Sequence, residues 1–201
     1  MSSLAPRRAL FLDRDGVINH DTGYVGRIAD MRFMPGIFDL VGLARAHHLA
    51  VVVVTNQSGI ARGLFSEDDY AELTRWMLAR FAERDAAIDR VYHCPHHPDA
   101  SVARYRADHP WRKPAPGMLL QAAADIGLDL AASALIGDKP SDMQAGAAAG
   151  IGLRVLIGDA TGVGQPDGIV PAGSVGDAID ILRDWLRQSP DCTSQSGKAE
   201  P

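Results

Sequence analysis

The sequence predicts an α/β protein built as a three-layer, doubly wound parallel sheet. Short apolar runs alternate with segments of helical periodicity along the chain, which is typical of repeated β-α units. The clearest run, residues 50–54, contains four consecutive valines and suits a central strand covered on both faces. With 201 residues, 46% of them hydrophobic, the chain is expected to form one sizeable core and to have no large cap domain.

Each element follows from its local pattern. We expect strands at residues 9–12, 50–54, 88–93, 133–136, 153–157 and 168–170, and helices at 37–47, 116–126, 141–149 and 175–187. A further helix follows Ser66 and Asp69, which form an N-cap pair, and it carries an apolar stripe at helical spacing. Ser141 and Gln144 predict a capping box at the start of the 141–149 helix.

The chain divides into an N-terminal extension (1–7), one domain (8–187) and a tail (188–201) whose composition predicts disorder. Residues 94–113 lack periodicity and contain several prolines, so we expect an ordered, functional loop there. No apolar run approaches the roughly 20 residues of a membrane span, and no segment resembles a signal peptide, which favours the cytoplasm. A net charge of −5 without a basic cluster argues against nucleic acid and membrane as partners, and the size favours a monomer.

Polar side chains gather where the predicted strands end. Asp13 and Asp15 follow the first strand, Thr55 begins the polar segment after the second, and Asp138 follows the fourth. The carboxyl ends of parallel strands meet at one edge of the sheet, where α/β proteins collect their ligands. Any one of these groups could be a helix cap, a turn or a surface charge. All of them in order predict a site.

The composition of these strand ends suggests a metal ion and a phosphate. Converging carboxylates repel one another unless a cation lies between them, and Mg²⁺ prefers such oxygen ligands and joins them to a substrate phosphate. Lys113 adds positive charge, and Thr55 and Asn56 supply neutral hydrogen bonds. Only three lysines are present, Lys113, Lys139 and Lys198, and the first two lie in these segments.

Longer motifs point to a known family. They are FLDRDGVIN at 11–19, DTGYV at 21–25, VVVTNQSGIARG at 52–63, CPHHP at 94–98, RKPAPGM at 112–118 and IGDKPSDMQAG at 136–146. Together they resemble the phosphatases of the haloacid dehalogenase superfamily, and within it the D-glycero-D-manno-heptose-1,7-bisphosphate 7-phosphatases and the related histidinol phosphatases. The resemblance covers about residues 8–187.

The resemblance implies a magnesium-dependent phosphoric monoester hydrolase. Its substrate would be a phosphorylated sugar, a heptose bisphosphate that loses its C7 phosphate during the synthesis of lipopolysaccharide core or of GDP-heptose for capsule precursors. Asp13 would attack phosphorus and form an aspartyl-phosphate, and Asp15 would serve as general acid and base. Mg²⁺ would be held by the carboxylates of Asp13 and Asp138 and by the backbone carbonyl of Asp15.

The same resemblance implies the substrate contacts. Thr55 and Lys113 would stabilise charge on the transferring phosphoryl group, with Lys139 nearby. The groups that face the sugar and its phosphates would be Asp21, Thr22, Gly23, Tyr24, Thr55, Asn56, Gln57, Ser58, Arg112, Lys113 and Lys139. Arg112 would bind the distant phosphate, since a guanidinium binds phosphate bidentately; the alternative is a surface arginine beside Lys113.

The loop 94–113 departs from the family pattern. Relatives commonly hold a structural zinc there on Cys-x-His followed by Cys-x-Cys. Here Cys94, His96 and His109 fill three of the four positions, and Trp111 stands in the fourth. Histidine can replace a cysteine ligand but tryptophan cannot, so zinc would need water or a substitute ligand from His93, His97 or Asp108. Alternatively, Trp111 fills the apolar centre of the loop.

Two alternatives stay open. Histidinol-phosphate phosphatases share the same motifs, and only turnover of the two substrates separates them. Phosphoacceptor signalling modules also use an aspartate at a strand end with Mg²⁺, a threonine and a lysine. They lack a second aspartate two residues later, so Asp15 favours the hydrolase.

Overall fold

The computed structural model describes residues 7–158 and 168–188 of the chain. Six strands form one sheet in the order β3-β2-β1-β4-β5-β6, and every neighbouring pair is parallel. The strands are β1 (Ala9–Leu12), β2 (Ala50–Asn56), β3 (Arg90–Cys94), β4 (Ala134–Gly137), β5 (Leu153–Ile157) and β6 (Ile169–Ala172). The order turns at β1, so the chain winds outward in both directions, as the doubly wound prediction requires.

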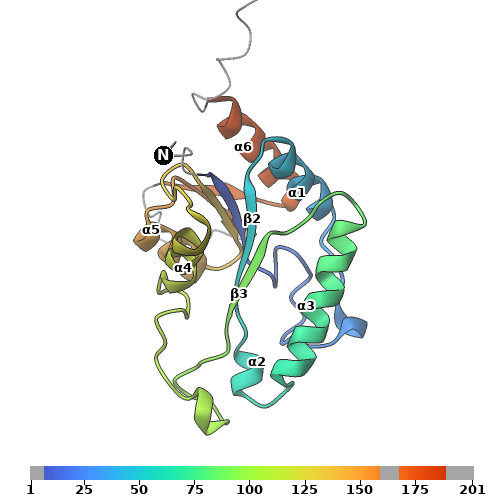
Figure 1. Ribbon diagram of the computed structural model, residues 1–201, viewed down its shortest axis with the longest axis vertical. Coiled ribbons are helices and arrows are strands. Elements are labelled where there is room, and N and C mark those ends of the chain that lie inside the picture. Colours follow the sequence, from blue (N-terminus) through green and yellow to red (C-terminus); the bar gives the residue numbers. More distant parts are fainter. Residues whose placement is uncertain (1–6, 159–167, 189–201) are drawn as a thin grey trace, which may run out of the picture.

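Helices cover both faces of the sheet, giving three layers (Figure 1). One face is covered by α1 (Ile37–Ala46), α3 (Glu67–Ala82) and α6 (Val175–Gln188), and the other by α4 (Gly117–Ile126) and α5 (Pro140–Ala149). The short helices are α2 (Ser58–Ala61) and the 3-10 turns η1 (Ile28–Asp30) and η2 (Ala103–Tyr105). No inserted cap domain interrupts the part of the chain that is described, in agreement with the predicted fold class.

Strand alternation divides the core into two clusters. Leu10 and Leu12 of β1 pack with α1, α3 and α6, whereas Ala9 and Phe11 pack on the opposite side with α4 and α5. All four side chains are fully buried, as the apolar run predicts for a strand covered on both faces. The sheet is therefore a rigid support for the residues that follow its strands.

Capping boxes were predicted at the N-termini of two helices. The Ser66–Asp69 pair forms a reciprocal capping box at the start of α3, which confirms that prediction. The capping box predicted at Ser141 and Gln144 is wrong. Helix α5 begins one residue earlier, at Pro140, and the carboxylate of Asp142 accepts the Lys139 N–H at 3.0 Å.

The register of the central strands brings the predicted site residues to one edge. Leu12 of β1 lies beside Val53 of β2 and Ile136 of β4, so the residues after these three strands emerge side by side. The predicted tail after Gln188 and residues 1–6 of the predicted N-terminal extension lie outside the described residues. Arg7 pairs with Leu128 as an isolated bridge. Among the described helices, none is long and apolar enough to cross a membrane.

Candidate active site

Lys113 lies buried between two carboxylates at the carboxyl edge of β1. Its Nζ is 3.0 Å from Asp13 Oδ1, 2.6 Å from Asp142 Oδ1 and 2.8 Å from the Val54 carbonyl oxygen. The ammonium group thus has one hydrogen bond to a carbonyl and ion pairs with two carboxylates. Burial opposes its charge, but the carboxylates of Asp13 and Asp142 raise the pKa of Lys113 and keep it protonated. The two carboxylates are thus joined by one cation inside the protein.

Asp13 is held in one orientation by its neighbours. Its Oδ1 accepts the Arg14 backbone N–H at 2.7 Å and also faces Lys113, whereas within the described chain Oδ2 has no protein partner. Burial and the neighbouring Asp142 raise the pKa of Asp13, and Lys113 acts in the opposite direction. One carboxylate oxygen is fixed and the other is left for a ligand.

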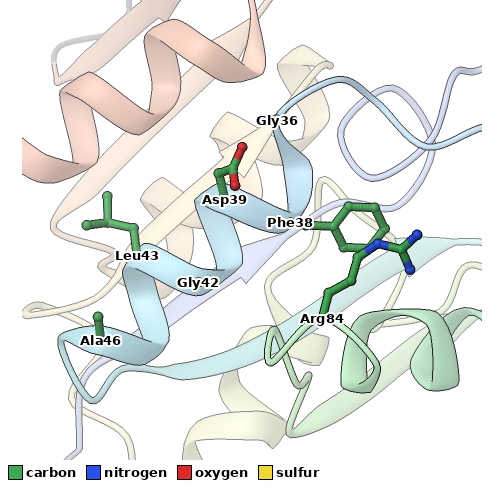
Figure 2. A pocket seen from close by; sticks show the side chains of 7 residues that line it. All are labelled: Gly36, Phe38, Asp39, Gly42, Leu43, Ala46 and Arg84. Atoms are coloured by element: carbon green, nitrogen blue, oxygen red, sulfur yellow. The ribbon is translucent and has the colours of Figure 1, made fainter.

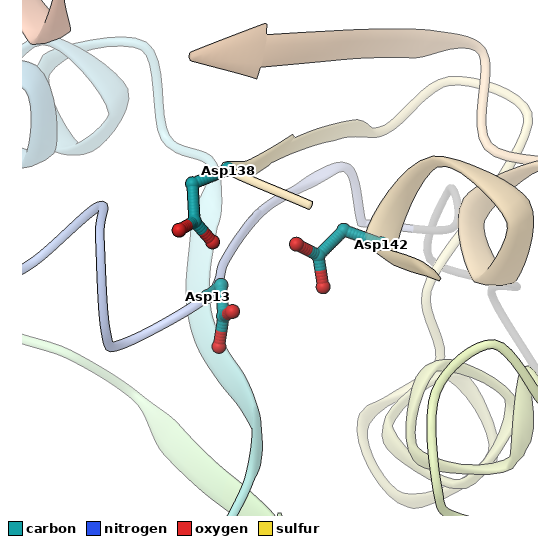
Figure 3. A group of neighbouring side chains, drawn as sticks. All are labelled: Asp13, Asp138 and Asp142. Carbon is teal, nitrogen blue, oxygen red and sulfur yellow. The ribbon is translucent and has the colours of Figure 1, made fainter. Parts of the chain in front are cut away.

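Asp138 and Asp142 complete an acidic group around Asp13 (Figure 3). One ligand atom from each of the three residues lies within 4.8 Å of the others, and among the described residues no other trio of acidic, histidine or cysteine side chains does so. Asp138 Oδ1 is buried without a hydrogen-bond partner. Burial and the charge of Asp13 raise the pKa of Asp138 to about 7. An oxygen donor set with an orphaned buried carboxylate oxygen fits a divalent cation such as Mg²⁺.

Two glycines make room for these carboxylates. Gly16 has a φ of +90°, and a Cβ there would lie 2.1 Å from Asp138 Oδ2. At Gly137 a Cβ would lie 2.4 Å from the Cβ of Asp142. Only glycine tolerates both approaches, so the DxDG and GDK segments are shaped to bring the acidic side chains together.

Asp15 has a different environment, in which neutral amides and a guanidinium surround its carboxylate. Its Oδ1 accepts from Asn19 Nδ2 at 2.9 Å, and its Oδ2 accepts from Gln57 Nε2 at 3.0 Å. The same Gln57 nitrogen donates to Thr55 Oγ1 at 2.8 Å. Arg14 forms a salt bridge with the carboxylate at 2.9 Å. Gln57 therefore links Asp15 to Thr55, as expected if both face one substrate.

The predicted outer groups lie at the rim of this site. Lys139 Nζ pairs with Asp21 Oδ2 at 3.0 Å and is 3.7 Å from Asp138 Oδ2, which joins the 21–24 turn to the acidic group. Burial opposes the charge of Lys139, but Asp138 and Asp21 raise its pKa. Tyr24 is half exposed and has a φ of +52°, so this turn presents its ring outward in a strained backbone conformation. Thr22 and Gly23 lie exposed in the same turn.

Two further residues that were predicted to face the substrate, Asn56 and Ser58, follow Thr55 in the chain. The Asn56 amide accepts from Lys113 N at 3.1 Å and donates to the Lys113 carbonyl at 3.0 Å, so its side chain positions Lys113 and is not free to bind a sugar. Ser58 begins α2 and is half-buried. These two hydrogen bonds hold the backbone of Lys113 against Asn56 at the end of β2.

Arg112, the residue before Lys113, lines a hollow of about 420 Å³. The other lining residues are Pro98, Asp108, His109, Pro110, Pro114 and Ala115. One guanidinium nitrogen donates to the His96 carbonyl at 3.2 Å. Burial lowers the pKa of Arg112, and no described carboxylate forms a salt bridge with it. Arg112 therefore keeps unused donors beside an open volume.

The residues present do not fit a zinc site in the 94–113 loop. The rings of His96 and His109 are stacked with centroids 4.4 Å apart and planes 4° apart, so no single ion can lie in the plane of both, as imidazole ligands require. His109 Nδ1 accepts the Trp111 N–H at 3.1 Å and lies 3.9 Å from Cys94 Sγ. Trp111 is half-buried and packs against the core cluster between the sheet and helices α4 and α5, and not at an apolar centre of the loop itself.

Two of the three substitute zinc ligands have other partners, and the third lines a hollow. His93 Nε2 lies at hydrogen-bond distance, 3.0 Å, from Glu67 Oε2, and His97 Nδ1 accepts the Asp99 N–H at 3.0 Å. Asp108 lines the hollow of Arg112. The loop is held by ring stacking, by hydrogen bonds and by Trp111.

Another hollow, of about 700 Å³, lies on the outer helical layer, away from the predicted residues (Figure 2). Its lining residues are Gly36, Phe38, Asp39, Gly42, Leu43, Ala46 and Arg84. The Arg84 guanidinium stacks on Phe38, with 4.5 Å between its Cζ and the ring centroid. The polar residues that carry the phosphate prediction are absent from this lining, so the candidate site is the one at the strand ends.

Arg14 and Asn19 had no role in the sequence interpretation, and Asp142 entered it only as the further aspartate of the motif that begins at Asp138. Arg14 and Asn19 hold Asp15, and Asp142 holds Lys113. Asp142 stands four residues after Asp138 in the GDKPSD motif, but the sequence gives no sign that its partner is Lys113. For Arg14 and Asn19 the only signal is their position beside the two acids in the DRDGVIN segment.

Comparison with known proteins shows the family to which this chain belongs. A family model described as HAD-hydrolase-like matches residues 110–170. The D-glycero-alpha-D-manno-heptose-1,7-bisphosphate 7-phosphatase of Burkholderia mallei is 55% identical over 152 residues, which are 76% of this chain and 80% of that protein. The D-glycero-beta-D-manno-heptose-1,7-bisphosphate 7-phosphatase of Escherichia coli K12 is 50% identical over 149 residues, 74% of this chain and 78% of that protein. This chain belongs to the heptose-bisphosphate phosphatase family of haloacid dehalogenase-like hydrolases.

Solved structures agree with the assignment. A haloacid dehalogenase-like phosphatase of Mesorhizobium loti superposes with a TM-score of 0.83 at 37% identity, covering 96% of this chain and 92% of that chain. The D,D-heptose 1,7-bisphosphate phosphatase of Bordetella bronchiseptica, solved with magnesium and phosphate, gives 0.77 at 30% identity, with 88% and 98% covered. A member of this family is a phosphoric monoester hydrolase, so the signalling-module alternative is set aside.

Proposed function

We propose that this haloacid dehalogenase-like phosphatase removes the C7 phosphate of D-glycero-D-manno-heptose 1,7-bisphosphate through an aspartyl-phosphate on Asp13. The observation that carries the proposal is the buried carboxylate of Asp13, which Lys113 holds in one orientation with an oxygen left free. The relatives named for this substrate support the choice of sugar. Their names differ in the anomer, so either anomer is a candidate.

In the first step, Asp13 Oδ2 attacks phosphorus and the bond from phosphorus to the sugar oxygen breaks. Asp15, protonated beforehand, gives its proton to the departing oxygen, and an alcohol leaves. In the second step, a water molecule attacks the aspartyl-phosphate, Asp15 takes a proton from that water, and inorganic phosphate is released. Asp15 ends the cycle protonated again, so protons balance.

Mg²⁺ would be held by the carboxylates of Asp13 and Asp138 and by the backbone carbonyl of Asp15, beside the orphaned oxygen of Asp138. When bound, it would neutralise negative charge on the phosphate oxygens and on these carboxylates. Asp142 stays with Lys113 in this assignment, because its pairing distance is 2.6 Å and its side chain is fully buried. The chain thus divides its acidic residues between a metal ion and a lysine.

The remaining residues orient the substrate. Thr55 donates to a phosphoryl oxygen, the positive charge of Lys113 stabilises the transferring phosphoryl group, and Gln57 keeps Thr55 aligned with Asp15. The 21–24 turn and Lys139 form the rim that faces the sugar. Arg112, with free donors beside its hollow, binds the distant phosphate bidentately. This substrate would belong to the synthesis of lipopolysaccharide core or of GDP-heptose precursors.

The proposal is tested by side-by-side turnover of the heptose bisphosphate and histidinol phosphate with Mg²⁺ present. We expect kcat/KM for the heptose bisphosphate to be higher by at least about 100-fold. Histidinol phosphate lacks the second phosphate, so it would leave the donors of Arg112 without a partner. Preference for histidinol phosphate would refute the substrate. Asp13→Asn should abolish phosphate release with the fold intact, and retained turnover would refute the nucleophile.

The role of Arg112 needs its own comparison. Arg112→Ala should weaken hydrolysis of the bisphosphate far more than that of the corresponding 7-monophosphate, since only the former carries the distant phosphate. Equal losses on both substrates would assign Arg112 to the structure of the loop.

A further inference from the structure

Arg14, which stands between the two predicted catalytic acids, is a fully buried charged residue that the mechanism above does not use. Its side chain is 1% exposed, whereas that of Asp15 is 16% exposed. The guanidinium therefore approaches Asp15 from the protein interior, and the open side of the carboxylate faces the site. A buried arginine is costly unless its charge is paired, so this position calls for an explanation.

The contact between Arg14 and Asp15 is a two-nitrogen fork. Nε lies 3.2 Å from Oδ1, and Nη2 lies 2.9 Å from both Oδ1 and Oδ2. Such planar contact fixes both the position and the rotation of a carboxylate, which a single ammonium cannot do.

The guanidinium also contacts groups other than Asp15, while its Nη1 is buried without a hydrogen-bond partner. Nη2 donates to the Val25 carbonyl oxygen at 2.5 Å, and Cζ lies 5.7 Å from the centroid of the Tyr70 ring on α3. Tyr70 is buried and packs in turn on the His93 ring, with 4.3 Å between centroids. Arg14 is thus connected to the helix layer and cannot follow Asp15 if that side chain moves.

The two oxygens of Asp15 are held unequally. Oδ1 accepts from Arg14 Nε, Arg14 Nη2 and Asn19 Nδ2, and Oδ2 accepts from Arg14 Nη2 and Gln57 Nε2. Gln57 also contacts Thr55, which marks Oδ2 as the oxygen on the side of the substrate. An oxygen that accepts fewer hydrogen bonds, one of them from a neutral amide, is the one that can carry a proton with the smaller loss.

We propose that Arg14 is a positioning residue of the acid-base step, which anchors Asp15 through Oδ1 and turns Oδ2 toward the leaving oxygen. This inference rests on the proposed role of Asp15 as general acid and base. In the forward step the proton passes from Oδ2 to the departing sugar oxygen while the bond from that oxygen to phosphorus breaks. Arg14 gives up no proton and touches no substrate atom.

The leaving group provides a readout that a purely structural role would not change. Departure of an alkoxide from a sugar phosphate needs a proton, whereas departure of p-nitrophenolate hardly does. The value of kcat/KM covers the steps up to that departure, so it isolates the acid function of Asp15. General acid catalysis contributes about 10²–10⁴-fold, which sets the size of the expected effect.

The experiment measures kcat/KM of Arg14→Met, Arg14→Lys and Asp15→Asn on the sugar bisphosphate and on p-nitrophenyl phosphate, with melting curves for each variant. We expect Arg14→Met to lose about 100-fold or more on the sugar phosphate and less than about 5-fold on the aryl phosphate. Arg14→Lys should recover little, because a lysine restores charge without the fork. Equal losses of Arg14→Met on both substrates would overturn the inference.

The Asp15→Asn variant tests the acid-base role of Asp15 separately from the positioning role of Arg14. If it shows no dependence on the leaving group, the proposed role of Asp15 fails. If it does and Arg14→Met does not, only the inference about Arg14 fails. Should Arg14→Met not fold, Arg14→Met/Asp15→Asn removes both charges of the buried pair. We expect this double variant to be no slower than Asp15→Asn on the sugar phosphate, and a further loss would contradict action through Asp15.

Discussion

Replacing Lys113 with methionine tests how strongly the acidic group depends on its internal cation. Lys113 is joined to Asp13 and Asp142 at 3.0 and 2.6 Å, and the side chains of both carboxylates are 7% exposed or less. Removal of one partner from a buried ion pair costs about 3–5 kcal/mol, because the remaining charge is left without compensation. For a domain of this size each kcal/mol lowers the melting temperature by about 2–4 °C, so Lys113→Met should melt about 6–20 °C lower.

The assay is a thermal melt in buffer with a chelator, so that no divalent cation replaces the lost ammonium. Lys139→Met is the matched control, since it deletes the same group from a side chain that is 48% exposed and pairs with Asp21 at 3.0 Å. An exposed pair contributes about 0–1 kcal/mol, so this variant should melt within about 4 °C of the wild type. Equal melting of the two variants would refute the reasoning.

A second substitution shows why Lys113→Met lowers the melting temperature. In Lys113→Met/Asp142→Asn one of the two uncompensated charges is gone, so the melting temperature should rise above that of Lys113→Met alone. A lower value would mean that methionine is tolerated poorly for its shape and not for its missing charge.

Three further outcomes are expected. Gly16→Ala should weaken Mg²⁺ binding in calorimetric titration, because its Cβ would lie 2.1 Å from Asp138 Oδ2, and unchanged affinity would contradict the close approach. Ser66→Ala removes the capping box with Asp69 and should cost about 1 kcal/mol in a chemical unfolding curve while kcat is unchanged. Protein purified without chelator should contain much less than one zinc per chain by elemental analysis, and a full equivalent would contradict the stacked arrangement in loop 94–113.

Much of the fold could be predicted from the sequence, because buried parallel strands leave a strong pattern. The valine run of β2 could belong only to a strand covered on both faces, and all of these valines are fully buried. The start of α5 could not be derived in the same way. Proline at the first helical position and Asp142 on the Lys139 N–H take over the roles assigned to Ser141 and Gln144.

The site was predictable where strand topology determines it and unpredictable where side-chain orientation does. Asp13 and Asp138 meet because their strands are neighbours in the sheet. The side chain of Asn56 also lies at a strand end, but it turns to the backbone of Lys113, 57 residues later in the chain. Sequence spacing does not predict this orientation of the Asn56 side chain, because it depends on the path of the loop that places Lys113 beside β2.

The two acids of the DxD motif differ because each meets a different cation. Asp13 faces an ammonium, a point charge that fixes Oδ1 and leaves Oδ2 open, which suits a nucleophile. Asp15 faces a guanidinium fork and two amides that contact both oxygens, which suits a group that must be aimed while it takes and gives a proton. Two equal carboxylates two residues apart can therefore do different chemistry, because each has different charged and polar neighbours. Arg14→Lys should accordingly impair proton transfer by Asp15 more than it impairs the attack of Asp13 on phosphorus.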